Sequence, residues 1–506
     1  MSPSLSAAPD DWLETAVPVQ QPWVPEGDTS RAGDRAARDS RSAATRYLCA
    51  AVALSPSVRR QALEGILEEE HRAVVTTPGV DLVTVMKYAL AARRREVIRD
   101  TILLIDLLLL VILTIVVHSG ILFLVLLVAA WVTVGVERYA NSYGAARALR
   151  PETFDPGKAP EPASNSYAGR QLVRIAAASA SGNVTLYSRF PPFVGYGTVT
   201  SSWSFTVDVT KPQDGDNPRP FSVHDVYDCV KDGLARLDFP GLQVTERVFV
   251  NGRDISDDRR FLRDRAAAPV ISIDSARMRE LMEVPEERAR PYLTIGMTGW
   301  EGDLAVTQFI RFLLSRSDLF VEAAHTVVPP LRAEFKSVDD RDPEIEFGEF
   351  IGLVTGSLLS TIPRLLGSVP GVIREMSSDG RRERKRRLAE KSGDYGALLS
   401  LREQAADTRW QRYFQVLDDA RYVKVVEQRI FRSLVEFLDK HDVDTSSLVS
   451  RSETLVNNGV MVTGGTLNAQ AVAAGPQAQA SASGIGAQAA SLVSRMRGGG
   501  EGRGGQ

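Results

Sequence analysis

The sequence predicts a multi-domain membrane protein. Its expected parts are an N-terminal helical unit, a transmembrane helical hairpin, a cytoplasmic α+β domain with a mostly antiparallel sheet, long C-terminal helices and a disordered Gly/Ala-rich tail. Three observations predict this fold. Residues 101–136 form an apolar block that a soluble fold does not need, the hydrophobic period becomes strand-like after residue 166, and large side chains nearly disappear after Leu467. The length of 506 residues also requires more than one structural unit.

Bulk composition narrows the classes of function. The chain is 44% hydrophobic and 24% charged, as in ordinary globular proteins, and its net charge of -3 creates no field that attracts nucleic acid. Cys49 and Cys229 are far apart, and the five histidines are scattered without the spacing of metal ligands. We therefore expect no cofactor, no metal site, no disulfide framework and no nucleic-acid partner.

The N-terminal part is expected to contain a leader and a helical unit. Residues 1–41 lack the apolar core of a signal peptide and are rich in Pro, Ser, Asp and Arg, which predicts a disordered leader. Residues 42–100 show apolar side chains at helical spacing. Ser55-Pro56 is typical of a helix start, and residues 81–99 lead as a helix into the apolar block.

The apolar block is expected to fold as two membrane spans. His118-Ser119-Gly120 interrupts it, and one continuous helix over the block would be about 50 Å long, whereas the hydrocarbon core is only ~30 Å thick. Four arginines lie at positions 93–99 and three at 138–150, but none lies in the turn at residues 118–120. The positive-inside rule then predicts a multi-pass protein of the plasma membrane with both termini in the cytoplasm.

Residues 151–166 are expected to be a linker, and residues 167–341 one α+β domain. Trp203, Phe205 and Val207 alternate with Ser and Thr, which is typical of a half-buried strand. Residues 222–237 form an amphipathic helical pattern, and residues 304–314 and 319–328 read as two strands of a hairpin.

The C-terminal region, residues 347–450, is expected to be helical. Residues 347–373 are apolar and rich in small residues, and Pro363 and Pro370 interrupt them, so a helix on the membrane surface is favoured over a third span. A basic run at residues 380–391 and a long amphipathic stretch at 395–440 follow. The low-complexity tail spans 457–506 and contains a short β-like arc at 458–467.

Three sets of polar residues are candidates for function. Asp106 lies inside the first span, where an ionisable group suggests a transport or proton role that also requires oligomers. The basic run can meet anionic headgroups, although a solvated helix face is the plainer interpretation. Its basic residues are Arg381, Arg382, Arg384, Lys385, Arg386 and Arg387. His224 and Asp228 share a helix face, but no nucleophile motif or phosphate loop accompanies them, so no catalytic residue is assigned.

Three short segments carry a resemblance to other proteins. These are residues 46–51 (RYLCAA), 69–74 (EEHRAV) and 249–254 (FVNGRD). In them the chain resembles two-span membrane proteins of high-GC Gram-positive bacteria, a resemblance that implies no particular activity and no functional residue. The tail from Gly464 is similar to short β-assembly motifs that end some bacterial signalling proteins.

The expected function is binding by a membrane-anchored cytoplasmic scaffold or sensor. Its expected partners are the lipid bilayer and either other proteins or further copies of itself. Two alternatives remain open at this point: an enzyme with a site near His224 and Asp228, and an oligomeric transporter that uses Asp106. A pocket lined by titratable groups would favour the enzyme, whereas a flat exposed sheet face would favour binding.

Overall fold

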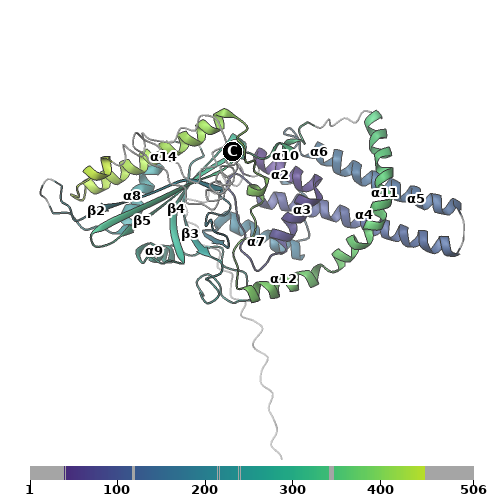
Figure 1. Cartoon of the computed structure of the whole chain (residues 1–506), viewed down its shortest axis with the longest axis horizontal. Helices are drawn as coiled ribbons and strands as arrows, with labels where there is room; N and C mark the ends of the chain where they lie inside the picture. Colours follow the sequence, from purple (N-terminus) through teal and green to yellow (C-terminus); the bar gives the residue numbers. More distant parts are fainter. Residues whose placement is uncertain are drawn as a thin grey trace, which may run out of the picture.

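A computed structural model describes residues 39, 41–116, 120–213, 215, 217–237, 239, 241–340 and 347–450. The predicted leader up to residue 38, most of the 118–120 turn and the tail at 457–506 lie outside the described residues. In space, a sheet domain lies at one end of the described part of the molecule, and two long helices project from the opposite end (Figure 1).

The sheet has six strands in the order β1-β3-β4-β5-β6-β2. Their bounds are β1 Val184–Tyr187, β2 Thr198–Asp208, β3 Gln243–Asn251, β4 Ala289–Gly299, β5 Leu304–Leu314 and β6 Asp318–Val328. β1 pairs with β3 in parallel, and every other pair is antiparallel. The expected α+β fold on a mostly antiparallel sheet is therefore confirmed.

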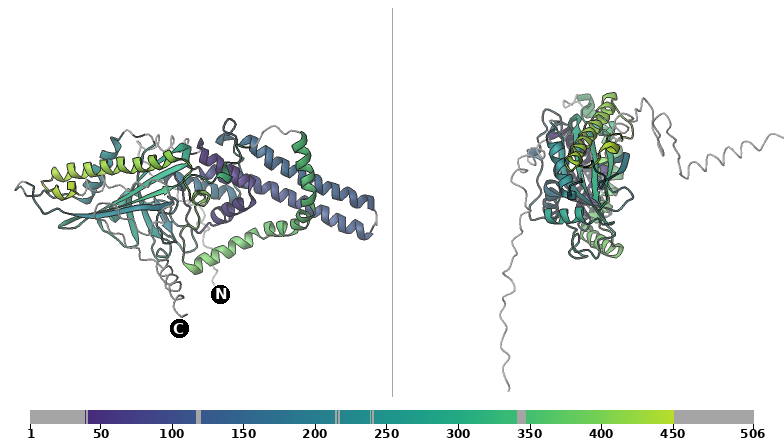
Figure 2. Two further views of the ribbon diagram at one scale, coloured as in Figure 1. Left: turned by 45° about the horizontal axis from the view of Figure 1, so that its top comes forward. Right: turned by 90° about the vertical axis from the view of Figure 1, so that its left-hand side faces the viewer.

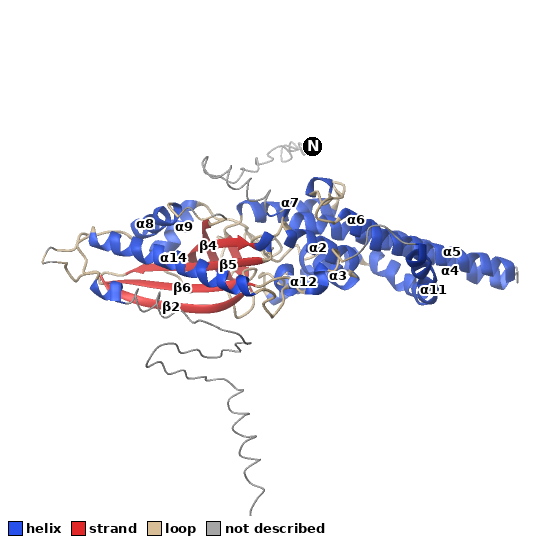
Figure 3. Cartoon of the chain, turned by 90° about the horizontal axis from the view of Figure 1, so that it is seen from above, coloured by secondary structure: helices blue, strands red, loops and turns tan. Residues whose placement is uncertain are grey.

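One face of the sheet carries the main core. Three helices cover it, namely α8 Val223–Ala235, α9 Ser275–Glu283 and α14 Tyr413–Asp439 (Figures 1 and 3). The alternation of apolar and polar residues in β2 determines which of its side chains join this core. Phe205 and Val207 face the helices, whereas Ser204 and Thr206 face away and are exposed. Ser222 caps α8 through a reciprocal hydrogen-bonded box with Asp225.

The other face of the sheet carries an aromatic cluster. The ring of Phe193 stacks on Phe309 with centroids 4.0 Å apart, and Phe249 and Tyr292 meet them edge to face. This cluster, together with Tyr196, fixes the loop between β1 and β2 on the sheet.

The N-terminal helices form a second core that includes distant parts of the chain. They are α2 Ala43–Leu54, α3 Pro56–Ala62, the π-helix η1 Leu63–Leu67 and the start of α4 Leu82–Val116. Helices α7 Tyr167–Ser181 and α13 Leu401–Ala405 pack with them, through Leu172 and Leu401. The helical stretch that begins after Ser55 ends at Leu67, and the chain then turns so that Glu69 faces a later helix, described below.

The projecting part consists of α4, α5 Gly120–Tyr139, α11 Phe347–Met376 and α12 Ser378–Ser392. α4 and α5 lie side by side, and α11 crosses them steeply before α12 returns to the N-terminal helices (Figure 2). α11 is one continuous helix with Pro363 and Pro370 inside it. The expected interruptions are absent from it because its buried side packs along both α4 and α5.

Short elements connect these parts. They are η2 Ala140–Gly144, α6 Ala145–Ala148, η3 Pro156–Lys158, η4 Trp300–Gly302 and α10 Ala333–Lys336. The amphipathic stretch expected at residues 395–440 is divided, because Ala406 and Arg412 have extended backbones between α13 and α14.

Candidate membrane-contacting site

The outward faces of α4 and α5 are apolar and exposed. Ile115 is 67% exposed and Ile121 is 77% exposed. Further exposed apolar residues on the pair are Ile102, Ile105, Leu108, Leu109, Val111, Ile112, Phe123, Leu124, Val125, Val128, Val132 and Val136. Within the described chain, α5 is the one helix long and apolar enough to cross a membrane. A continuous apolar surface of this kind marks contact with lipid or with another protein.

α11 has its polar side inward and its apolar side outward. Ser357, Thr361 and Ser368 are all at most 1% exposed, and Leu365 packs with Leu103, Ala130 and Val134 of the hairpin. The exposed side carries a stripe at helical spacing: Ile362, Leu366, Val369, Ile373 and Met376. This arrangement is the reverse of the one that water favours on a helix.

A charged cluster lies where α11 crosses the hairpin. Glu137 of α5 accepts hydrogen bonds from Arg99 of α4 at 3.0 Å and from Arg364 of α11 at 2.9 Å. Glu137 lies beyond Val134 toward the body of the protein. An α-helix turns about 100° per residue, so Leu366 lies ~160° around α11 from Arg364. The apolar stripe of α11 therefore faces the tip of the hairpin, away from the charges.

α11 approaches α4 closely at Gly371. A Cβ on Gly371 would lie 3.0 Å or less from carboxyl atoms of Asp100. At two other glycines of α11 there is more room, because Gly352 has no atom within 4 Å of such a Cβ and Gly356 meets only the tip of Arg138.

The basic run on α12 divides into two faces. Lys385 lies 2.9 Å from Glu69, Arg381 lies 3.9 Å from Glu68, and the guanidinium of Arg382 lies 3.9 Å from the ring centroid of Tyr167. On the other face, Arg384 and Arg387 are exposed, and Arg386 is half-exposed beside Glu383 and Glu390. The structure therefore brings three of the six basic residues against the N-terminal helices. Contact of the run with headgroups remains a prediction, for which the second face is available.

Asp106 is buried in the hairpin near the crossing of α11. It is 7% exposed, and one of its carboxylate oxygens has no hydrogen-bond partner in the described part of the chain. Leu103, about one turn before it, and Leu107, the next residue, pack in the small core of the crossing. The carboxyl group thus faces protein and not the exposed surface of the pair.

His224 and Asp228 do not form a joint site. His224 Nε2 lies 3.8 Å from Glu283 of α9, whereas Asp228 pairs with Lys231 at 2.7 Å, and Lys231 also reaches Glu246. Hydrogen bonds from Ser222 lower the pKa of the neighbouring Asp225, as its place in the capping box requires. Among the residues the structure describes, no group of three or more His, Cys, Asp or Glu could hold a metal ion.

A polar cluster beneath α14 was missed from the sequence. His325 of β6 is hydrogen-bonded through Nδ1 to the hydroxyl of Thr200, and its Nε2 lies 3.2 Å from Asp419 of α14. Thr200, an exposed residue, sits where the β2 register shifts at a bulge. Beside it, Trp203 Nε1 donates to Glu427 at 2.7 Å, and burial raises the pKa of Glu427.

This polar cluster joins three elements that are far apart in the sequence. A histidine between a hydroxyl and a carboxylate can move a proton. The adjacent cavity, however, is about 10 Å³, which leaves room for roughly one water molecule. The sequence contains two signals of this polar cluster, a histidine within an apolar strand and two acidic residues on the apolar side of α14. Neither signal identifies its partner.

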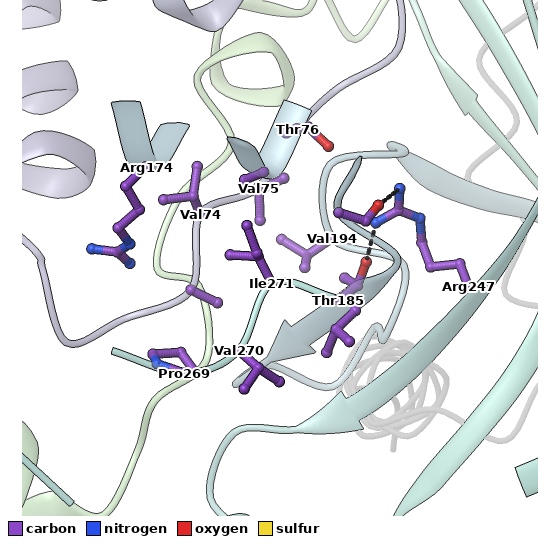
Figure 4. A pocket seen from close by; sticks show the side chains of 14 residues that line it. Val74, Val75, Thr76, Arg174, Thr185, Val194, Arg247, Pro269, Val270 and Ile271 are labelled. Atoms are coloured by element: carbon purple, nitrogen blue, oxygen red, sulfur yellow. Dashed lines mark hydrogen bonds between the residues drawn. The ribbon is translucent and has the colours of Figure 1, made fainter. Parts of the chain in front are cut away.

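A second cavity lies between the N-terminal helices and the sheet. Figure 4 shows Val74 and Val75 from one side facing Thr185 and Arg247 from the other, with Ile271 between them. Arg247 donates to the Thr185 hydroxyl at 3.2 Å and to the Gly182 carbonyl at 2.7 Å. The free volume of this cavity is about 20 Å³, which suits one or two waters, whereas small-molecule sites have roughly 300 Å³ or more.

Comparison with known proteins yields one match. A family described as the AbeC-like domain matches residues 202–470, which begin within β2 and continue past α14. No curated protein and no solved structure matches the chain. The resemblance to membrane proteins of high-GC Gram-positive bacteria is not part of this match and stays a prediction.

Proposed function

The chain belongs to the AbeC-like domain family, whose match covers more than half of it, and from this premise we propose that it is a membrane-anchored binding protein. In this proposal α4 and α5 span the plasma membrane as a hairpin with both termini cytoplasmic. α11 lies in the cytoplasmic headgroup region, and the sheet domain is held beside the membrane to bind protein partners.

The reversed arrangement of α11 is the observation that carries the proposal. Ser357, Thr361 and Ser368 are buried against the hairpin, whereas the stripe from Ile362 to Met376 is exposed. Exposure of the stripe to water costs a free energy of roughly 25 cal/mol per Å² of apolar surface, whereas the headgroup–acyl boundary would bury it. The direction of the stripe, toward the tip of the hairpin, is the direction of the bilayer centre in this arrangement.

Helix lengths agree with a hairpin that includes α11. From Leu103, where α11 crosses, to Val116 the rise of α4 is about 20 Å at ~1.5 Å per residue. An interfacial helix is buried roughly 5–10 Å deep. Together these lengths approach the ~30 Å of the hydrocarbon core.

The sheet domain supports a role in binding. Its cavities of about 10 and 20 Å³ are far below the size of a small-molecule site, whereas β2 presents an exposed face of Ser and Thr side chains along its length. An exposed surface of this kind suits a macromolecular partner, which is why we propose binding and not turnover as the activity of this domain.

Depth measurements test the membrane arrangement on the full chain. Cys49 and Cys229 are replaced by Ser, a single cysteine is placed at Leu366 or Val284, and each is labelled with a fluorophore in lipid nanodiscs. Both native side chains are exposed and apolar, at 62% and 60%, but Val284 lies on the sheet domain. The proposal requires strong quenching by doxyl lipids at position 366 and little at 284. Equal, weak quenching at both positions would contradict it.

A further inference from the structure

The two edges of the sheet differ in how far other segments of the chain cover them. At one edge β1 has only four residues, and Tyr187 forms a bridge with Ala397, whose amide donates to Leu186. At the other edge β2 has eleven residues and pairs with β6 on its inner side (Figure 3). Within the described residues, no strand pairs with the outer side of β2.

The outer edge of β2 lacks the usual protection of edge strands. From Thr198 to Val207 it carries no charge and no proline. Proteins commonly place Lys, Pro or a covering segment at such an edge, because its unpaired amides and carbonyls accept another strand. A bulge at Thr200 and the charge of Asp208 at the end of β2 are such devices, and the stretch from Ser201 to Val207 between them is regular. This stretch is a ready template for one more strand.

A segment of the same chain is suited to this edge. Residues 458–467 are uncharged, and Val460, Val462 and Thr463 are β-branched, which favours a strand. The AbeC-like match extends to residue 470 and therefore includes this segment in the family domain, whereas it excludes the Ala/Gln-rich remainder.

The position at which the described chain ends places this segment within reach. The amide of Asp444 donates to the carbonyl of Lys211 at 2.9 Å, and Pro212 bridges Val443, just after the end of β2 at Asp208. Leu448 is fully buried in the main core. The ten residues from Ser450 to Val460 span up to roughly 33 Å, about the length of β2.

We propose that residues 459–463 add as a seventh strand to the outer edge of β2, antiparallel to it. The segment enters at the Asp208 end and runs back toward Thr198. Val460 and Val462 then extend the apolar row of Phe205 and Val207 beside α14, and Thr463 joins the Ser and Thr side chains of the other face. The chain thereby closes its second edge, as the segment at Ala397 covers the first.

Hydrogen exchange on the full chain in detergent micelles tests this strand. The alternate amides of β2 that face outward exchange about tenfold or more slowly if a strand covers them. Val460→Pro with Val462→Pro removes the hydrogen bonds of the added strand and should restore fast exchange in peptides from β2. Val472→Pro, which lies beyond residue 470, should leave β2 protected, and slow exchange in β5 verifies that every variant is folded.

Three results would overturn the proposal. The first is fast exchange of β2 in the unmodified chain, and the second is protection that survives the two prolines. The third is protection that disappears on dilution, because the strand would then come from a second copy. Protection that is lost in the double-proline variant alone, at every protein concentration, supports the proposal.

Discussion

The guanidinium of Arg364 in α11 donates a 2.9 Å hydrogen bond to the carboxylate of Glu137 in α5. The two residues are 227 positions apart, and their pairing joins the C-terminal helical region to the hairpin. Because Arg99 reaches the same carboxylate, one acidic side chain holds three helices at the point where apolar surface gives way to charge.

Glu137→Gln should loosen this crossing. The substitution keeps the shape of the side chain but removes the carboxylate that Arg364 pairs with and leaves Arg99 with Asp100 alone, at a cost of about 1–3 kcal/mol. The thermal unfolding midpoint of the protein in micelles should fall by a few degrees. Glu152→Gln, at an exposed turn position, is the control and should leave the midpoint unchanged. Equal shifts in both variants would mean that Glu137 has no special role.

The exposed face of α12 should approach anionic lipid. A fluorophore at Leu388→Cys in nanodiscs should be quenched more by headgroup-labelled lipids in anionic discs than in neutral discs. The difference should shrink between 0.1 and about 0.5 M salt, because the Debye length falls from ~10 Å toward ~4 Å.

A charge-matched pair of variants identifies the residues responsible for that approach. Arg384→Gln with Arg387→Gln should abolish the difference between anionic and neutral discs. Arg236→Gln with Arg259→Gln removes the same charge from exposed positions of the sheet domain and should preserve it. Identical quenching in anionic and neutral discs for the unmodified chain would show that the run is a solvated face.

Glu427→Gln should stabilise the protein at neutral pH. Burial raises the pKa of Glu427 above its ordinary value of 4.5, although Trp203, His325 and Lys424 oppose the shift. The folded state therefore holds this proton more tightly than the unfolded state does. Its stabilising contribution is complete below about pH 4.5 and is lost as pH rises through the folded pKa.

Unfolding curves between pH 4 and 8 measure this effect. The Gln variant keeps an acceptor for Trp203, so it should match the parent near pH 4 and exceed it at pH 8. Glu436→Gln, at an exposed position of the same helix, should follow the parent throughout. A Gln variant less stable than the parent at pH 8 would refute the assigned cause.

The structure and the sequence agree where the deciding interactions are local. Phe205 and Val207 alternate with polar residues, and that period fixes which side of β2 is buried wherever the strand is placed. The contacts of α12 could not be predicted in the same way. Lys385 donates to the backbone carbonyl of Glu64, 321 positions away, and any of several acidic runs would have matched the basic run equally well.

Long-range packing also decided the two features that the sequence misjudged or missed. Pro363 and Pro370 locally favour a break, but packing along α4 and α5 keeps α11 continuous. Thr200, His325 and Asp419 become neighbours only once β2 and β6 are paired and α14 lies across them. Neither outcome has a signature within a short stretch of sequence.

Asp106→Asn should be tolerated and should raise the stability of the hairpin. An amide is cheaper to bury than a carboxylate whose oxygen lacks a partner, and a gain of about 1 kcal/mol or more is expected. Thermal unfolding in micelles measures it, with Asp379→Asn on the exposed start of α12 as the control. A stable Asn variant that loses the cellular phenotype would instead support the transporter alternative.

Labelling of single cysteines in intact cells tests the membrane topology most directly. With Cys49 and Cys229 replaced by Ser, a membrane-impermeant maleimide is applied to cells that carry Ser119→Cys or Ser164→Cys. The account predicts labelling at position 119 in intact cells and at position 164 only after permeabilisation, because the turn is outside and the linker is cytoplasmic. Labelling at position 164 in intact cells, or at neither position until the membrane is opened, would contradict the two-span hairpin.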